Sequence, residues 1–571
     1  MLRQLIYLAC LSLLISSIIT EKPFSSLNDI SKVTLDEIDE IANKFNVTYD
    51  PLSNAELLLG SDPKSFFSKP FLSEQKVPRG GNCELRTDYQ IPSFFMFFPA
   101  YKGKLRHLGD TIKYKNHCFK DNTITLIDQT NDSITLELTA NNATSYLCND
   151  IYLFFTSSIH QVKMIYFKGT SIITINYLTA NQLREINSNG MRIFAFCDNV
   201  PRTLTSTYKT ANFIMTNPAP EPGEPKQTKF LFSMLPEWKY DFDAIAEEHV
   251  EFLKTYAHLN MKKRVGYENT VLPVEKYIKS GDFIGLHEIV SGESCLIQYG
   301  CGSAISHSAI AIRHPVTNEL YVAEAEDRGL LLKTYKEFLE DNIVTMHSIA
   351  WFPLREEYSK RFDSRKAWDW AQKRVGQAYG MSNFISGPID TLDGNTPEYL
   401  ALEHVMLIVA IMEAVSPKIA RQYLIDGLNV RIGTNFTTLQ EVTEEISRRN
   451  KTVEEVLIMP EREDYIYPNG ENWVCSSFVV GIMKEGGIFG DIEIEPHEFT
   501  PRDIYQMDIY DKEFRKNGPK ECLEADPELD YCMIYGQYDV RAEGYSTIPL
   551  YEHMNERCSS QPPEYKREEG C

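Results

Sequence analysis

After its first 20 residues, the chain lacks any apolar run long enough to cross a membrane. A transmembrane helix needs about 20 consecutive apolar residues, and the longest candidate, residues 405–415, is shorter and contains Glu413. Positive charge is also scarce, because 58 Lys and Arg residues face 80 Asp and Glu residues, which gives a net charge of −22. This charge argues against nucleic acid or an anionic membrane surface as the main partner. We therefore expect no nucleic-acid partner, and no membrane span once the N-terminal segment is removed.

Three kinds of binding motif are also missing from the sequence. It contains no His and Cys residues with the spacing of a metal site, and no glycine-rich loop of the kind that cradles a phosphate. It also contains no basic stripe with interleaved aromatic residues. These absences predict a protein without a metal ion or another cofactor.

The first 20 residues have the features of a secretory signal peptide. Arg3 supplies a positive charge, residues 5–15 form a short apolar core, and small or hydroxyl residues follow as far as Thr20. An uncleaved N-terminal anchor is the alternative interpretation. We expect the protein to be secreted or delivered to the endolysosomal lumen.

The number of cysteines agrees with an exported protein. Of 12 cysteines, Cys10 lies in the signal peptide, and the remaining 11 are an odd number. If Cys475 is a free thiol, the other ten suffice for five disulfides, whose pairing the spacing does not decide. These ten are Cys83, Cys118, Cys148, Cys197, Cys295, Cys301, Cys522, Cys532, Cys558 and Cys571.

Five Asn-x-Ser/Thr triplets fit the same export route, because this triplet is the acceptor for N-glycosylation in secreted proteins. A single triplet arises easily by chance, but the signal peptide and the cysteine count agree with it. We therefore predict a glycoprotein. The acceptor residues are Asn46, Asn131, Asn142, Asn435 and Asn450.

The N-terminal half divides by composition into a lead-in, a domain and a linker. Residues 21–80 resemble a pro-segment or irregular lead-in. Residues 81–205 contain short strands of alternating apolar and polar residues, separated by turns, and predict an antiparallel β-rich domain with disulfides. Residues 206–273 combine a proline-rich linker at 218–225 with a helical stretch.

The C-terminal half mixes helices and strands, so the chain as a whole is expected to be α+β. Residues 274–510 form the second expected domain, with a strand at 309–313 and its return strand at 320–324. Residues 398–424 are strongly helical and predict a helical insertion in this domain. Residues 511–571 form a cysteine-containing tail with little regular pattern.

Cys475 stands just before an apolar run that is typical of a buried helix. Unpaired N–H groups and the dipole at a helix N-terminus stabilise a thiolate, and the same N–H groups can hold an oxyanion. His307 begins the strand far upstream, and a Cys with a His is the minimum set for nucleophilic acyl transfer. The alternatives are an inert buried thiol for Cys475 and a core or turn histidine for His307.

Glu324 lies on the expected return strand, across the hairpin from His307. Paired strands bring two side chains together when both point to the same face of the sheet. A carboxylate beside a histidine fixes its tautomer and favours the imidazolium. Glu326 has the same strand parity and could replace Glu324. We predict Cys475 as the nucleophile, with its own backbone N–H as an oxyanion donor, His307 as the base and later the acid, and Glu324 as the orienting group.

Five short motifs carry a resemblance to a known family. They are residues 280–284, 306–311, 321–325, 376–380 and 473–478. Their order resembles the permuted papain-like cysteine hydrolases of the YiiX type, relatives of the NlpC-type cell-wall hydrolases and of lecithin:retinol acyltransferases. In that family a Gly-Asp strand opens the domain, a His begins the next strand, an acidic residue follows on its partner, and the Cys comes last at a helix start.

The resemblance implies a permuted papain-like (NlpC-like) domain within residues 274–500, with His307, Glu324 and Cys475 in the family's three catalytic roles. We expect a secreted cysteine peptidase or amidase that cleaves its substrate through a thioester. One alternative is acyl transfer to or from a lipid, motivated by the apolar residues 405–415. The other is a non-enzymatic binding protein on the same fold, with Cys475 buried or disulfide-bonded. The expected partner is thus a peptide, amide or lipid-acyl substrate.

Overall fold

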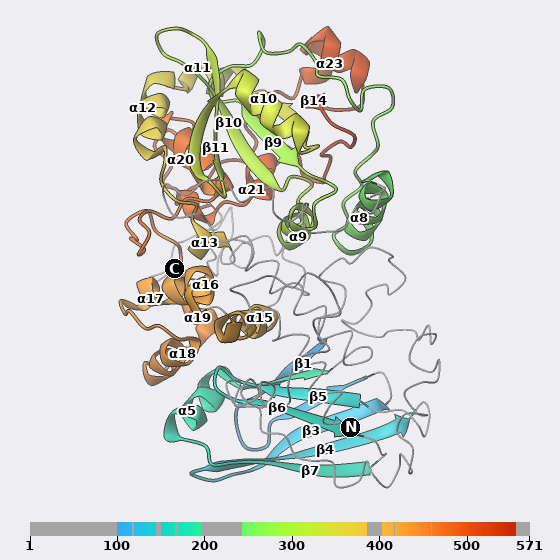
Figure 1. Ribbon diagram of the computed structural model, residues 1–571, viewed down its shortest axis with the longest axis vertical. Coiled ribbons are helices and arrows are strands. Elements are labelled where there is room, and N and C mark those ends of the chain that lie inside the picture. The colour runs from blue at the N-terminus through green and yellow to red at the C-terminus, as the bar shows by residue number, and fades with distance from the viewer. Residues whose placement is uncertain are drawn as a thin grey trace, which may run out of the picture. The chain divides into compact units, whose positions relative to one another are not determined.

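The computed structural model describes most of the chain from residue 100 onward (Figure 1). The described residues are 100–116, 119–143, 150–165, 169–195, 242–384, 402–415, 417–457 and 459–554. The expected signal peptide, the lead-in and Asn46 lie outside them. The described residues contain both helices and antiparallel sheets, so the predicted α+β class is confirmed.

The chain forms two compact units, and neither is continuous in sequence. The first comprises Met1–Thr216, Leu402–Arg421 and Thr434–Val456, and the second comprises Asn217–Ala401, Gln422–Gly433 and Leu457–Cys571. The sequence placed the whole helical insertion in the second domain. In the structure, Leu402–Arg421 of that insertion and the later segment Thr434–Val456 belong to the first unit.

The described part of the first unit contains two antiparallel sheets. One has the order β2-β3-β4-β7, and the other has the order β1-β8-β5-β6. Apolar and polar residues alternate along these strands, so each sheet has a buried face and an exposed face. Along β4, Leu136 and Leu138 are buried in the core, while Thr135 and Thr139 make hydroxyl contacts on the exposed face. The strands are β1 (Ala100–Leu105), β2 (Thr111–Tyr114), β3 (Phe119–Gln129), β4 (Ser133–Ala143), β5 (Asp150–Phe155), β6 (His160–Ile165), β7 (Gly169–Asn176) and β8 (Met191–Ala195).

Helices from residues 402–457 complete this unit. α18 (Leu439–Arg448) packs against α5 (Ala180–Asn189), and Ser447 Oγ lies 2.8 Å from Ser188 Oγ. α18 begins with a capping box between Thr438 and Glu441. The other helices of this region are α15 (Leu402–Val415), α16 (Pro417–Ala420) and α19 (Val453–Leu457).

The second unit is built on a six-stranded antiparallel sheet with the order β12-β11-β10-β9-β13-β14. The expected hairpin forms two adjacent strands of this sheet, β10 and β11, and Ala309 on β10 pairs with Glu324 on β11. The strands are β9 (Phe283–His287), β10 (His307–Arg313), β11 (Leu320–Glu326), β12 (Gly329–Thr334), β13 (Ser348–Phe352) and β14 (Cys532–Tyr535).

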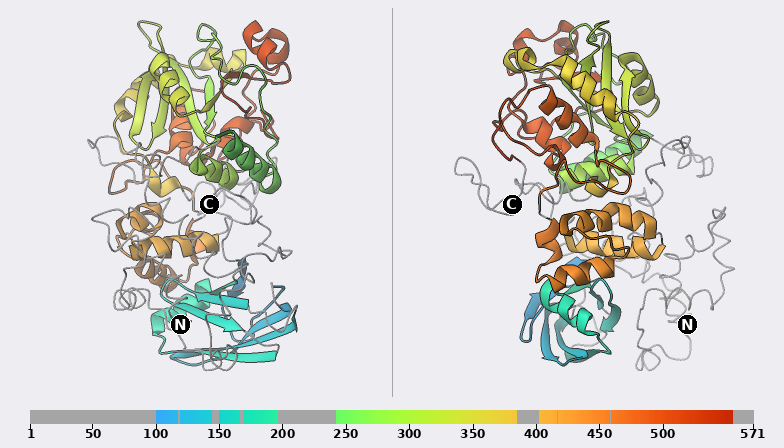
Figure 2. Two further views of the ribbon diagram at one scale, coloured as in Figure 1. Left: turned by 45° about the vertical axis from the view of Figure 1, so that its right-hand side comes forward. Right: turned by 90° about the vertical axis from the view of Figure 1, so that its left-hand side faces the viewer.

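Helices lie on both sides of this sheet (Figure 2). α10 (Tyr335–Val344) contributes Tyr335 and Phe338 to the core cluster that includes Ala309 and Ala311. α20 (Cys475–Glu485) contacts β10 and β11, and α12 (Ser364–Arg374) packs against α20. The remaining helices are α8 (Phe242–Tyr256), α9 (Gly292–Cys301), α11 (Glu356–Arg361), α13 (Met381–Phe384), η4 (Arg421–Ile425), α17 (Asp426–Ile432), η5 (Pro496–Glu498), α21 (Pro501–Gln506), α22 (Phe514–Asn517) and α23 (Lys520–Ala525).

The long helix expected at residues 398–424 is interrupted in the structure. α15 ends at Val415, and a new helix starts at Pro417. Proline has no N–H for the preceding turn and its ring clashes there, so it is tolerated only in the first turn of a helix. Helical structure then continues through the π-helical turn η4 into α17.

The structure confirms one pair of the disulfide candidates and shows two others as free thiols. Cys522 and Cys532 form a disulfide that joins α23 to β14. Cys295 and Cys301, both disulfide candidates, are instead buried free thiols at two positions on α9. Six residues along a helix turn the second side chain about 240° away from the first, so the two cannot meet. The other six disulfide candidates lie outside the described residues: Cys83, Cys118, Cys148, Cys197, Cys558 and Cys571.

The acceptor asparagines that fall in the described ranges are all exposed. They are Asn131, Asn142, Asn435 and Asn450. Within those ranges, no helix is both long enough and apolar enough to cross a membrane.

Candidate active site

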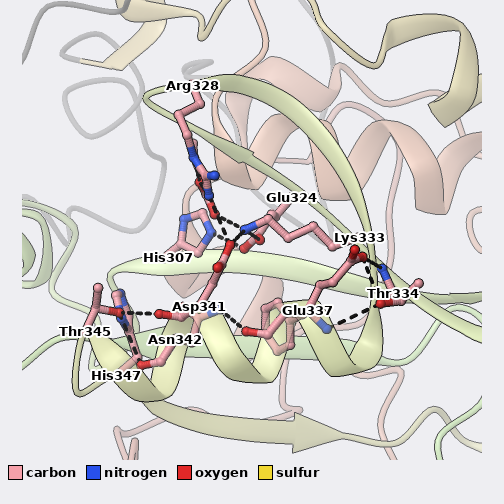
Figure 3. Close-up of polar contacts among 12 residues, drawn as sticks. His307, Glu324, Arg328, Lys333, Thr334, Glu337, Asp341, Asn342, Thr345 and His347 are labelled. Carbon is pink, nitrogen blue, oxygen red and sulfur yellow. Dashed lines mark hydrogen bonds and ion pairs between the residues drawn. The ribbon is translucent and has the colours of Figure 1, made fainter. Parts of the chain in front are cut away.

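The β10–β11 hairpin brings His307 and Glu324 together. His307 is the first residue of β10, and its Nε2 atom lies 3.0 Å from Oε2 of Glu324 (Figure 3). The Glu324 side chain is buried, whereas about 20% of the His307 side chain is exposed. Because the strand register sets Ala309 opposite Glu324, the carboxylate reaches back along the same face toward the ring.

Cys475 is the first residue of α20, and its thiol contacts His307. Burial by itself would raise the pKa of this thiol. The hydrogen bond and charge of His307 oppose burial, and the backbone N–H of Ser308 and the hydroxyl of Tyr379 donate further hydrogen bonds to the sulfur. The net result is a pKa below the ordinary thiol value.

The pKa of His307 moves in the opposite direction. Burial would lower it, but hydrogen bonds and charge attraction from Cys475 and Glu324 raise it to about 10. A lowered thiol pKa beside a raised imidazole pKa favours a thiolate–imidazolium ion pair. Since Nε2 faces Glu324, Nδ1 is the ring nitrogen left for the sulfur.

A network of charges surrounds Glu324 (Figure 3). Lys333 on β12 places Nζ 2.8 Å from Glu324 Oε1, 2.5 Å from Glu326 Oε1 and 3.0 Å from Asp341 Oδ2. Arg328 pairs with Glu326 and Asp341. Burial would raise the pKa of Glu324, but His307 and Lys333 hold it well below its usual range. Glu324 is therefore ionised between two cations.

Glu326, the alternative orienting residue, contacts Arg328 and Lys333 through its carboxylate. Its pKa is raised, first by burial and then by the charge of Glu324. The carboxylate against His307 is thus that of Glu324. Sequence reasoning did not single out Lys333, although a lone lysine in the apolar strand Gly329–Thr334 was a signal that a buried acid required a partner.

The start of α20 presents backbone N–H groups beside the thiol. The first bond of the helical ladder runs from the Phe478 N–H to the Val474 carbonyl at 2.9 Å. The N–H groups of Cys475 and Ser476 precede it and have no acceptor within the helix. Ser477 Oγ accepts from the Val474 N–H at 2.8 Å and donates to the Val474 carbonyl at 3.1 Å, which fixes this turn.

Tyr379 reaches the sulfur from a segment held by backbone hydrogen bonds. The Gly376 N–H donates to the Leu330 carbonyl at 2.9 Å, and the Gly380 N–H donates to the Trp473 carbonyl at 2.9 Å. A Cβ at Gly380 would lie 2.5 Å from the carbonyl carbon of Asn472, so only glycine fits. Residues 376–380 were one of the five sequence motifs, but the motif did not predict a role for Tyr379.

Asp282, in the Gly-Asp motif, has a structural position away from the thiol. Its carboxylate accepts hydrogen bonds from the Lys279 N–H at 2.8 Å, the Leu354 N–H at 3.0 Å and Trp351 Nε1 at 2.8 Å. Burial raises its pKa to about 6 in spite of these bonds. Asp282 therefore fastens the start of β9 to the end of β13.

The other free thiols contrast with Cys475. Burial raises the pKa values of Cys295 and Cys301, without a histidine to oppose it. Among the described residues, no group of three or more His, Cys, Asp or Glu side chains has the arrangement of a metal site. Cys475 is thus the one described free thiol whose surroundings favour the thiolate.

Comparisons of the chain with protein-family models, with curated proteins and with solved structures give no match.

Proposed function

We propose that this protein is a cysteine hydrolase that cleaves an amide or peptide bond through a thioester on Cys475. The observation that carries the proposal is the Cys475–His307 pair, in which the thiol pKa is lowered and the imidazole pKa is raised. Glu324 on the far side of the ring supports the imidazolium. A thiolate is the nucleophilic form of cysteine, so this pair is prepared for acyl transfer.

The reaction begins when Sγ of the Cys475 thiolate attacks the substrate carbonyl carbon. A C–S bond forms and the carbonyl electron pair moves to oxygen, where the Cys475 N–H at the start of α20 donates to the oxyanion. Collapse of this intermediate breaks the C–N bond. The departing nitrogen takes the proton of the His307 imidazolium, which leaves a thioester and a neutral imidazole.

In the second half of the reaction, water hydrolyses the thioester and His307 acts first as a base. His307 takes a proton from water as the oxygen attacks the thioester carbonyl, and the second oxyanion occupies the same position. Collapse breaks the C–S bond and releases the acid, which restores the thiolate and the imidazolium. Glu324 holds the ring in place throughout and stays ionised.

We propose that the unit containing His307, Glu324 and Cys475 has a permuted papain-like fold. Support comes from the order of the three residues along the chain and from their elements: His307 opens β10, Glu324 lies on β11, and Cys475 opens α20, which contacts both strands. The resemblance of the motifs to the YiiX-type hydrolases points the same way.

The two alternatives make different predictions for the thiol. Acyl transfer to or from a lipid was motivated by residues 405–415, which lie on α15, and it predicts a lipid acyl group trapped on Cys475. A binding protein was expected to have Cys475 buried or disulfide-bonded. The thiol is free, and Cys475 is only 7% exposed. Its chemical reactivity therefore decides between an enzyme and a binding protein.

The deciding experiment is iodoacetamide labelling of the folded protein across pH, read at each cysteine by peptide mapping. Cys295 and Cys301 serve as internal references for buried thiols. We expect Cys475 to react well below the ordinary thiol pKa, and His307→Ala to slow it by roughly tenfold or more. His107→Ala, an exposed histidine of the first unit, is the matched control. Labelling of Cys475 no faster than the references would reject the proposal.

A screen of substrates follows a positive result. Peptide and simple amide substrates are compared with lipid acyl esters, and hydroxylamine is added to trap the acyl-enzyme as a hydroxamate. Turnover of amides supports hydrolysis. A trapped lipid acyl group without amide turnover would instead identify an acyltransferase.

A further inference from the structure

A basic pocket lies at the end of β10 opposite His307. Its volume is about 460 Å³, and its lining includes Lys279, Arg313, His314, Ser359, Ser364 and Arg365. Arg313 is the last residue of β10 and His307 is the first. Six residues of extended strand separate them by roughly 20 Å. The pocket is therefore distinct from the candidate active site.

The pocket is lined by positive charge, whereas the whole protein carries a net negative charge. Three of the lining residues are Lys or Arg and none is Asp or Glu, although the chain has a net charge of −22. The lining comes from three parts of the second unit: the turn before β9, the β10–β11 turn, and the neighbouring helices α11 and α12. Tertiary structure alone assembles this group of cations.

Arg313 is a fixed cation that forms no ion pair with a carboxylate among the described residues. Its guanidinium donates to three backbone carbonyls, those of Glu275 at 2.7 Å, Ile278 at 2.8 Å and Asn318 at 3.1 Å. Carbonyl oxygens orient a guanidinium but do not neutralise its charge. Arg313 thus adds a permanent positive charge to the wall of the pocket.

Lys279 and Arg365 supply the movable cations. Neither makes an ion pair within the part of the chain that the structure describes, whereas Lys360 nearby pairs with Glu356 at 2.5 Å. Lys279 favours the ionised forms of Asp282 and Glu356 by its charge, at a longer range than an ion pair. The acid closest to Arg365 in sequence, Asp363, accepts from the backbone N–H groups of Arg365 and Lys366, each at 3.1 Å, as the N-cap of α12. Its carboxylate is therefore occupied by the helix backbone.

Neutral donors complete the lining. Nδ1 of His314 accepts from the Val316 N–H at 3.2 Å and the Thr317 N–H at 3.1 Å, so the proton of the neutral ring is on Nε2. The edge-to-face contact with Trp368, at 4.6 Å between ring centres, holds the ring in position. Ser359 and Ser364 add two hydroxyls.

We propose that this pocket binds the phosphate group of a small phosphorylated ligand. Two cations that form no ion pair among the described residues, an imidazole N–H and two hydroxyls offer more donors than the two oxygens of one carboxylate can use, and Arg313 adds its fixed charge. They suit the three free oxygens of a phosphate monoester, which form strong charge-assisted hydrogen bonds with Lys and Arg. The volume of the pocket leaves room for the group that carries the phosphate.

The test is calorimetric titration of the full chain with inorganic phosphate, with acetate as the carboxylate comparison. Lys279→Gln/Arg365→Gln removes the two movable cations, and Lys360→Gln/Lys366→Gln is a control with the same change in net charge. We expect saturable phosphate binding that weakens at least about tenfold in the pocket variant and is retained in the control. Equal binding by wild type and pocket variant, equally tight acetate binding, or no phosphate binding would overturn the proposal.

A second arm identifies the source of the phosphate. Glycerol phosphate is titrated in solution, and phosphatidylcholine vesicles with and without phosphatidic acid are tested by co-sedimentation. Binding of glycerol phosphate indicates a soluble phosphomonoester, and binding only to vesicles that contain phosphatidic acid indicates a lipid headgroup. Because none of these measurements uses the thiol, Cys475→Ala should bind phosphate like the wild type. Failure of the hydrolase proposal would therefore leave this one intact.

Discussion

Lys333 Nζ lies 2.8 Å from one oxygen of Glu324, and His307 Nε2 lies 3.0 Å from the other. A buried carboxylate loses its charge unless cations or hydrogen bonds compensate for the lost hydration. Lys333 therefore acts as a positioning residue that keeps Glu324 ionised. Through Glu324 it also keeps the His307 imidazolium stable beside the thiol.

Lys333→Met tests this relationship. Loss of the ammonium should raise the pKa of Glu324, lower the pKa of His307 and reduce the thiolate fraction of Cys475. We expect iodoacetamide labelling of Cys475 at neutral pH to slow by roughly tenfold, which corresponds to about one pKa unit. Lys336→Met is the control, because Lys336 is exposed and, among the described residues, pairs with Glu340 alone at 3.8 Å. An unchanged pH profile in Lys333→Met would contradict the role given to Lys333.

The pH dependence of hydrolysis should differ from that of labelling. Hydrolysis requires the thiolate and the imidazolium together, so kcat/KM should rise with the lowered pKa of Cys475 and fall again near pH 10 as His307 loses its proton. Labelling requires only the thiolate and should not fall on the alkaline side. Parallel profiles of the two rates would argue against His307 as the proton donor.

The same pKa shift predicts a change in stability with pH. The pKa of His307 is higher in the folded protein, about 10, than its ordinary value of 6.5. Its contribution to the free energy of unfolding is therefore complete below about pH 6.5 and is lost as the pH rises toward 10. Denaturant unfolding of the wild type and of His307→Ala should show a difference that shrinks over this range. A difference independent of pH would mean that His307 titrates normally.

Tyr379→Phe removes one hydroxyl from the sulfur and little else. We expect the pKa of Cys475 to rise by roughly one unit, because one hydrogen bond to the charged form is lost. The measurement is the midpoint of the labelling profile at Cys475. Tyr277→Phe, an exposed tyrosine of the same unit, should leave the midpoint in place. A midpoint that also stays unchanged in Tyr379→Phe would remove the tyrosine from the site.

Asp282→Ala should act on stability. It leaves the Trp351 Nε1–H and the N–H groups of Lys279 and Leu354 without their acceptor. We expect the free energy of unfolding to fall by about 3 kcal/mol, since each buried unsatisfied donor costs about 1–3 kcal/mol. Asp369→Ala on the exposed side of α12 is the control and should change little. A loss as small as that of the control would show that water replaces the carboxylate.

Several elements were predictable because their signals are local. Alternating apolar residues on either side of a turn predicted strands at 309–313 and 320–324, close to the observed β10 and β11. The apolar run after Cys475 predicted the helix that begins there. The break at Pro417 in the helix expected at 398–424 was not predicted, because the apolar residues keep helical spacing on both sides of the proline.

By itself, the sequence determined the α+β class, the hairpin that sets Glu324 within reach of His307, and the helix start at Cys475. Each depends on neighbours in the chain, through strand parity or helix capping. Only the tertiary structure decided that Lys333 and Tyr379 reach these groups, that Cys295 and Cys301 stay reduced, and that three separate segments form the basic pocket. Those contacts depend on strand register and on the packing of distant segments, which no local pattern of residues encodes.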